Sequence, residues 1–164
     1  MNWKQPKVYA VKHKDEMTRA ASRSGGIFTA LSDQVLSNGG VVYGCVLTEE
    51  FDAVHIRTDN AEDRNRMRGS KYIQSKLGDT FKSVKTDLDA KKSVLFSGTS
   101  CQVAGLKKYI GKEYDNLFCV DIVCHGVPSK KNMGGISALA KSIKMHSKSC
   151  KVWTSENKKR LWMA

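Results

Sequence analysis

Two cysteines in this 164-residue chain each follow an apolar stretch that is typical of a buried strand. Cys101 comes after residues 93–97 (SVLFS) and a Gly-Thr-Ser turn, and it opens a stretch that predicts a helix over about 101–110. Cys124 directly follows residues 117–123 (LFCVDIV). Because N–H groups at a helix start stabilise a thiolate, Cys101 could bind a metal or act as a nucleophile. A half-buried cysteine packed beneath the turn is the plain alternative.

If the two strands are parallel neighbours, Cys101 and Cys124 lie at the same edge of the sheet. Thiolates gathered at one point suggest an iron–sulfur cluster. His125 leaves a second interpretation open, in which Cys101 attacks a substrate and His125 is its base. In a third, His125 makes only a capping hydrogen bond. The remaining cysteines form no C-x-x-C pair and are expected to be structural: Cys45, Cys119 and Cys150.

Two further segments could bind an anion. Ser24, Gly25 and Gly26 precede a helical pattern, and glycines there let backbone amides approach a phosphate. The segment matches neither the Rossmann nor the Walker fingerprint, so an ordinary helix start is the simpler interpretation. In residues 68–72, basic side chains could bind phosphate or carboxylate and Tyr72 could stack on a flat ring. A solvated basic loop is the alternative there.

Apolar patterns predict the elements that position these segments. Strands are expected at 7–13, 41–47, 53–58, 93–97, 117–123 and 150–154, and helices at 27–36, 79–90, 101–110 and 130–144, with a polar loop within 60–75. This order favours an α/β fold, a mostly parallel mixed sheet flanked by helices. We expect one domain over residues 1–164, with a loosely ordered tail at 145–164.

The formal net charge of +12 attracts anions, such as a nucleic acid or a dinucleotide, although a solvated basic surface would also explain it. Aromatic residues are not interleaved with the basic ones, which disfavours a nucleic-acid platform. No apolar run approaches the roughly 20 residues of a membrane span, and the first residues lack a signal-peptide pattern. A cytoplasmic protein without a membrane segment is therefore expected.

Taken together, five motifs are more specific than any one alone. They are S-R-S-G-G, G-G-V-V-Y-G, R-G-S-K-Y-x-Q-S, F-S-G-T-x-C-Q-x-A-G-L and V-D-x-x-C-H-G-V-P-S. From about Val8 to Ser129 the chain resembles the coenzyme F420 hydrogenase/dehydrogenase beta-subunit family, especially bacterial members found with polysaccharide genes. The resemblance implies an α/β oxidoreductase with FAD and a 4Fe-4S iron–sulfur cluster. Such members transfer electrons to or from coenzyme F420 or another reducible partner, or a ferredoxin-like protein.

The resemblance also implies roles for single residues. Cys101 and Cys124 would be cluster ligands. The residues that would contact FAD or the second redox partner are Ser24, Gly25, Gly26, Arg68, Gly69, Ser70, Lys71, Tyr72, Thr99, Gln102 and His125.

Three departures from the family pattern bear on function. Arg23 interrupts the usual S-S-S-G-G, and Ser100 replaces the proline of G-T-P-C-Q, which removes rigidity from the turn. A 4Fe-4S cluster commonly takes four thiolates, whereas two cysteines match. The ferredoxin-like C-x-x-C segment that precedes this region in longer relatives is not found in the sequence. We therefore expect the incomplete core of a longer protein, with a non-catalytic binding or assembly remnant as the alternative.

Overall fold

The computed structural model describes residues 7–50 and 52–127 of the chain. These residues lie in one compact unit, residues 1–127. The expected helix at 130–144, the strand at 150–154, the tail at 145–164 and Cys150 lie outside the described residues. In the part that is described, no helix combines the length and apolarity needed to cross a membrane.

Four strands form one mixed sheet in the order β2-β1-β3-β4. They are β1 (Val41–Leu47), β2 (Ala53–Thr58), β3 (Val94–Thr99) and β4 (Leu117–Ile122). β1 pairs antiparallel with β2, while β1 with β3 and β3 with β4 are parallel pairs. The predicted α/β fold with a mostly parallel mixed sheet is confirmed, and so are four of its predicted strands.

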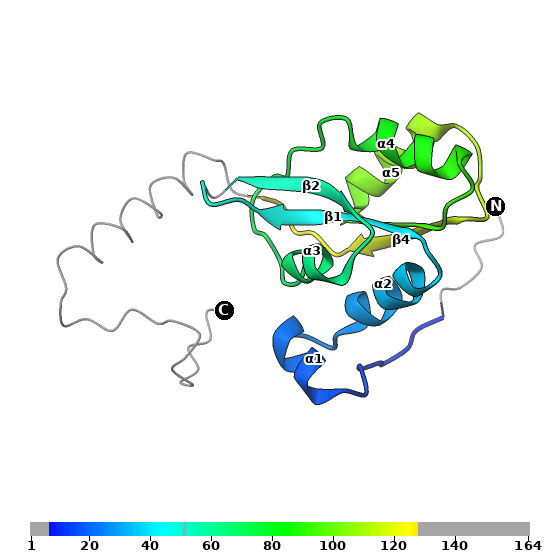
Figure 1. Ribbon diagram of the computed structural model, residues 1–164. Helices are drawn as coiled ribbons and strands as arrows, with labels where there is room; N and C mark the ends of the chain where they lie inside the picture. The colour runs from blue at the N-terminus through cyan, green and yellow to red at the C-terminus, as the bar shows by residue number, and fades with distance from the viewer. Residues whose placement is uncertain (1–6, 51, 128–164) are drawn as a thin grey trace. The chain divides into compact units, whose positions relative to one another are not determined.

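Five helices accompany the sheet: α1 (Glu16–Ser22), α2 (Ile27–Ser37), α3 (Ala61–Arg66), α4 (Thr80–Asp89) and α5 (Ser100–Ile110). Figure 1 shows α2 and α3 on one face of the sheet and α4 and α5 on the other. Alternate residues of β1 supply the two cores, because successive strand side chains point to opposite faces. Tyr43 packs with α4 and α5, whereas Val42 and Val46 pack with α2 and α3.

Asp87 of α4 ties that helix to the two antiparallel strands. Its carboxylate accepts hydrogen bonds from the Tyr43 hydroxyl (2.6 Å) and from Nε of Arg57 (2.7 Å). Lys92 is a further cation at this carboxylate, with its Nζ 3.2 Å from Asp87 Oδ1. Burial raises the pKa of Asp87, but the hydrogen bonds from Arg57, Tyr43 and Lys92 outweigh it and lower the pKa to about 2.

The predicted strand at 7–13 is wrong. The segment alternates as a strand would, yet no strand lies beside it among the described residues. Val8 is 90% exposed and Tyr9 71% exposed. The segment is held to a neighbouring loop by a hydrogen bond of 2.7 Å that His13 N–H donates to Gly25 O. Alternation alone cannot supply the missing partner strand.

Two short helices were not predicted from the sequence. α1 lies in a polar stretch, and α3 lies within the stretch 60–75, which was expected to contain a loop. Both begin with a capping side chain: Asp15 accepts from Thr18 N, and Asn60 accepts from Asp63 N. These caps were the available signal, because neither stretch shows an apolar period.

Candidate functional site

The parallel strands β1, β3 and β4 end at Leu47, Thr99 and Ile122, and we call these ends the carboxyl edge. Thr99 and Ile122 are paired in register, and Cys101 and Cys124 follow them within two residues. Both cysteines are exposed. The sheet therefore places the two thiols after the ends of neighbouring parallel strands, as the sequence predicted.

The turn before Cys101 is held by side chains on both sides. Thr99 is the N-cap residue of α5, and its Oγ1 lies 3.1 Å from the Cys101 sulfur. Ser100, which replaces the family's proline, donates a hydrogen bond of 2.8 Å to Asp121 of β4. The serine thus ties the turn to the next strand.

Gln102 connects this turn to a segment that is distant in sequence. Its Oε1 accepts from Thr99 N at 3.0 Å, and its Nε2 donates to Ser75 Oγ at 2.7 Å. The residue is 5% exposed. We call this arrangement the Gln102 bridge.

The glycine turn before α2 leaves that helix start without a side-chain cap. Gly26 is the N-cap residue in the left-handed region (φ 76°), and no side chain caps the helix. A Cβ there would lie 2.9 Å from His13 Cβ, so the turn requires glycine. Ser24 is exposed and Gly25 half-buried. Uncapped N–H groups and the helix dipole suit an anionic group, which fits a dinucleotide phosphate.

Arg68 joins the basic segment to this helix start. Its Nε donates to Thr29 Oγ1 at 3.1 Å, and Thr29 Oγ1 lies 3.4 Å from Ser22 Oγ. Burial and the nearby Arg64 both lower the pKa of Arg68. Two motifs that are separated in sequence therefore meet in the structure around Thr29.

Arg64 is a site neighbour that the sequence did not reveal. It is 3% exposed, and its Nη1 donates to Thr29 O (2.9 Å) and Ser32 Oγ (2.7 Å). Its Nη2 lies 2.6 Å from Asp33. Arg64 thus fixes α3 against the first turns of α2. Arg68 contacts the same part of α2 through Thr29. An arginine in a short polar stretch gives no sequence signal of burial.

The remaining residues of the basic segment differ in their surroundings. The Lys71 ammonium donates to the carbonyl oxygens of residues 66–69, at distances of 2.8–3.1 Å. Burial lowers its pKa. Gly69 and Ser70 are exposed, and the Tyr72 ring is 75% exposed. The Lys71 ammonium is therefore bonded to backbone carbonyl groups at and just after the end of α3, whereas the Tyr72 ring is accessible to a stacking partner.

The described residues do not complete a metal site. Within residues 7–50 and 52–127, no group of three or more His, Cys, Asp and Glu side chains could hold a metal ion. Cys101 and Cys124 alone do not fit a 4Fe-4S cluster, which commonly takes four thiolates. Cys124 Sγ accepts from Gly126 N at 3.4 Å. His125 is exposed and makes no hydrogen bond to Cys101 in the described part, so the geometry gives the Cys/His nucleophile no support.

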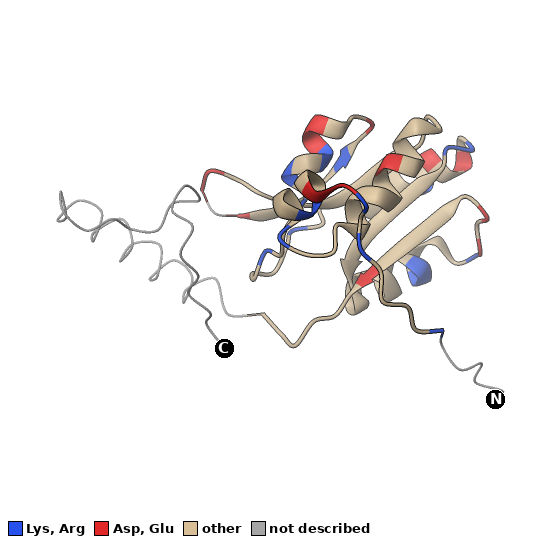
Figure 2. Cartoon of the chain, turned by 90° about the horizontal axis from the view of Figure 1, so that it is seen from below, with Lys and Arg blue, Asp and Glu red and all other residues tan. Residues whose placement is uncertain are grey.

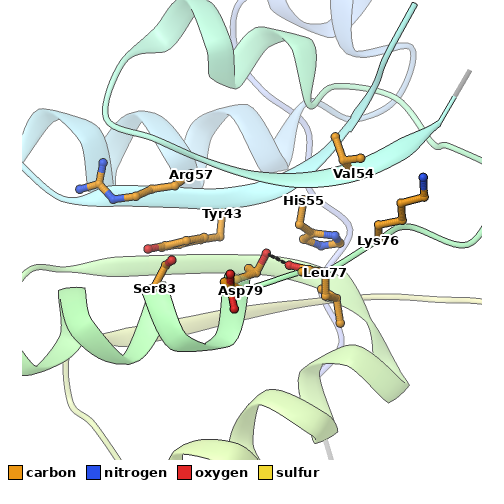
Figure 3. Close-up of a pocket in the computed structure, with 10 residues that line it drawn as sticks. Tyr43, Val54, His55, Arg57, Lys76, Leu77, Asp79 and Ser83 are labelled. Atoms are coloured by element: carbon orange, nitrogen blue, oxygen red, sulfur yellow. Dashed lines mark hydrogen bonds between the residues drawn. The ribbon is translucent and has the colours of Figure 1, made fainter. Parts of the chain in front are cut away.

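A cavity of about 340 Å³ lies elsewhere, between β2 and the start of α4 (Figure 3). His55 lines it, with Nε2 3.1 Å from Ser97 O and the ring stacked on Phe96. None of the residues expected at the site lines this cavity. We place the candidate site at the carboxyl edge instead, because hydrogen bonds there join three of the sequence motifs.

Charge does not mark a further face. Figure 2 shows basic and acidic residues interspersed over the described helices and loops. Nine of the 28 Lys and Arg residues, but one of the 16 acidic residues, lie in residues 128–164. Much of the +12 charge therefore belongs to sequence outside the described fold.

The fold is that of an α/β protein with a mostly parallel sheet. Its glycine turn precedes α2, its basic segment follows α3, and its two exposed thiols follow β3 and β4. Residues 8–82 match the model for the N-terminal part of the coenzyme F420 hydrogenase/dehydrogenase beta subunit. This match covers just under half of the chain and supports the family that the sequence predicted. No curated protein matches the chain.

A solved structure shares the fold. It is a chain from a xenon-derivatised structure of the F420-reducing [NiFe] hydrogenase complex of Methanosarcina barkeri. The match has a TM-score of 0.58 and 20% sequence identity, and it covers 76% of this chain. The chain spans 46% of that longer one.

Proposed function

We propose that this chain is an electron-transferring flavoprotein module, which binds FAD between the glycine turn at 24–26 and the basic segment at 68–72. The hydrogen bond between Arg68 and Thr29 is the observation that carries the proposal, because it holds the basic segment against the first turn of α2, which follows the glycine turn. The first amides of α2 would hold a phosphate, with Arg68 as the adjacent cation. Bound FAD would supply a centre that accepts and releases electrons.

Other residues support this assignment from the same edge. The exposed Tyr72 ring would stack on a flat ring of the cofactor, with Gly69 and Ser70 beside it. Thr99 and His125 are further proposed contacts at the ends of β3 and β4. We propose that Cys101 and Cys124 would contribute two thiolates to an iron–sulfur cluster, which would need further ligands besides these two.

We propose a separate redox protein as the partner, with F420 or another reducible compound as the second electron carrier. Membership of the matched hydrogenase chain in a multi-subunit complex supports a protein partner. A non-catalytic assembly module is the alternative, favoured by the incomplete set of thiols within residues 7–50 and 52–127. It would associate stably with a cluster protein without binding FAD.

The test is FAD binding to the anaerobically purified full chain, followed by flavin fluorescence, with iron measured in parallel. Arg68→Met is expected to weaken FAD binding at least about tenfold, since it removes a charge-assisted contact to phosphate. Arg66→Met is the matched control, because Arg66 is exposed and pairs with Asp63. It should change affinity less than about twofold. A folded chain that binds no FAD, or equal losses in both variants, contradicts the proposal.

A further inference from the structure

Gln102 was expected to contact a cofactor, but both ends of its amide are bonded inside the chain. A backbone N–H can only donate, so the atom that faces Thr99 N is the amide oxygen. The amide nitrogen then faces Ser75 Oγ, at 2.7 Å. With the residue 5% exposed, little of the side chain is left for a ligand.

The Gln102 bridge connects the two halves of the candidate site. At one end, Thr99 caps α5 and its hydroxyl lies against the Cys101 sulfur. At the other end, Ser75 closes the segment that begins with Arg68, and it is 27 residues away from Gln102 in sequence. The bridge thus ties the thiol-bearing turn to the basic segment.

Strand β3 leaves room for this amide. A Cβ at Gly98 would lie 3.0 Å from Gln102 Oε1 and 3.2 Å from Gln102 Cβ. A side chain at this position would make a contact tighter than an ordinary one, so the glycine favours the close passage of the backbone past the amide. A buried amide that lost its partners would be left with unsatisfied polar atoms, which is unfavourable.

We infer that Gln102 is a positioning residue, which holds the Cys101 turn and the 68–75 segment as one unit. The Cys101 turn is then preorganised for a ligand that binds the basic segment. The inference relies on the proposed function only for the identity of that ligand. Its rival is a plain helix cap, in which Gln102 stabilises the start of α5 and nothing else.

Hydrogen exchange of the full chain, followed by mass spectrometry, separates the two roles. Gln102→Met should speed exchange about two- to tenfold at the start of α5 and also in peptides covering 66–77. Ser75→Ala keeps the helix cap and should speed exchange in 66–77 alone. Gln34→Met, at an exposed position of α2, is the control and should change neither region. An effect of Gln102→Met confined to α5, with Ser75→Ala silent, overturns the inference.

A conservative variant and a binding measurement complete the test. In Gln102→Glu the carboxylate can accept from both Thr99 N–H and the Ser75 hydroxyl, so it should restore protection. FAD affinity should fall about tenfold in Gln102→Met and recover in Gln102→Glu. If the wild-type chain binds no FAD, the proposed function fails while hydrogen exchange still decides on the bridge. Unchanged FAD affinity in a Gln102→Met chain with loosened 66–77 would overturn the positioning role.

Discussion

At the residue scale, Asp87 shows how one carboxylate couples pH to stability. Its folded pKa of about 2 lies below the ordinary value of 3.8. Folding therefore favours the ionised form, and the contribution is fully present above about pH 4. It is lost as the pH falls toward 2, and it amounts to about 2 kcal/mol.

Asp87→Asn should accordingly lower the free energy of unfolding at pH 7 by about 2 kcal/mol, as measured by urea denaturation. The amide keeps the shape but loses the charge that holds Arg57 and Lys92. Asp115→Asn, at an exposed position, is the control and should stay within about 0.5 kcal/mol of wild type. The gap between wild type and Asp87→Asn should narrow below pH 4, and a gap independent of pH would contradict this account.

The long-range partners of single residues could not be predicted from the sequence. The motifs identified Arg68 and Gln102 by type, but not their partners Thr29 and Ser75. Those contacts cross 39 and 27 residues of sequence, and no local period encodes them. Arg64 was missed for the same reason, because its burial depends on how α3 packs against α2.

At the element scale, burial decided which predictions succeeded. The strands at 41–47 and 53–58 were predicted to the residue, because β-branched and apolar runs mark a sheet covered on both faces. The segment 7–13 has a similar alternation but no neighbouring strand. α1 and α3 are too short for a helical period to show. The sequence therefore predicts buried elements well and short polar ones poorly.

Replacing glycine by alanine should have opposite effects on the free energy of unfolding at two positions, Gly40 and Gly105. At Gly40, where α2 turns into β1, a Cβ would lie 2.5 Å from Ser93 O and 2.8 Å from Val35 O. Gly40→Ala should lower the free energy of unfolding by about 1–3 kcal/mol, because backbone atoms cannot easily move aside. In α5, a Cβ at Gly105 would meet the Phe81 ring at 3.4 Å, an ordinary contact.

Gly105→Ala should therefore raise the free energy of unfolding by up to about 1 kcal/mol, since alanine favours a helix. Urea denaturation of both variants against wild type measures the two effects. Destabilisation by Gly105→Ala would show that α4 and α5 pack too tightly for the added methyl group.

At the scale of the whole molecule, His55 makes the fold sensitive to mild acid. Burial lowers its pKa below the ordinary 6.5, although the bond to Ser97 O partly offsets this. As the pH falls, His55 in the unfolded chain therefore binds a proton at a higher pH than His55 in the folded chain. Stability from this group is full above about pH 6.5 and is lost as the pH falls through the folded pKa.

Thermal unfolding should show this as a Tm that falls between pH 7 and 5. In His55→Phe the ring still stacks on Phe96 but cannot titrate, so the slope of Tm against pH should flatten. The variant's absolute Tm should fall too, because Ser97 O loses its partner. His125→Asn, at an exposed position, should keep the wild-type slope. An unchanged slope in His55→Phe would assign the acid sensitivity to other groups.

Lys71 has a consequence for the field that an anionic ligand would experience. In terms of coordination chemistry, its ammonium is a tethered monovalent cation inside a shell of four carbonyl oxygens. Three of those carbonyls belong to residues 66–68 at the end of α3, where the helix dipole is negative. Their dipoles compensate the lysine charge locally. Counting basic residues in the motif thus overstates the attraction to an anion, and Arg68 is the cation that acts beside the first turn of α2.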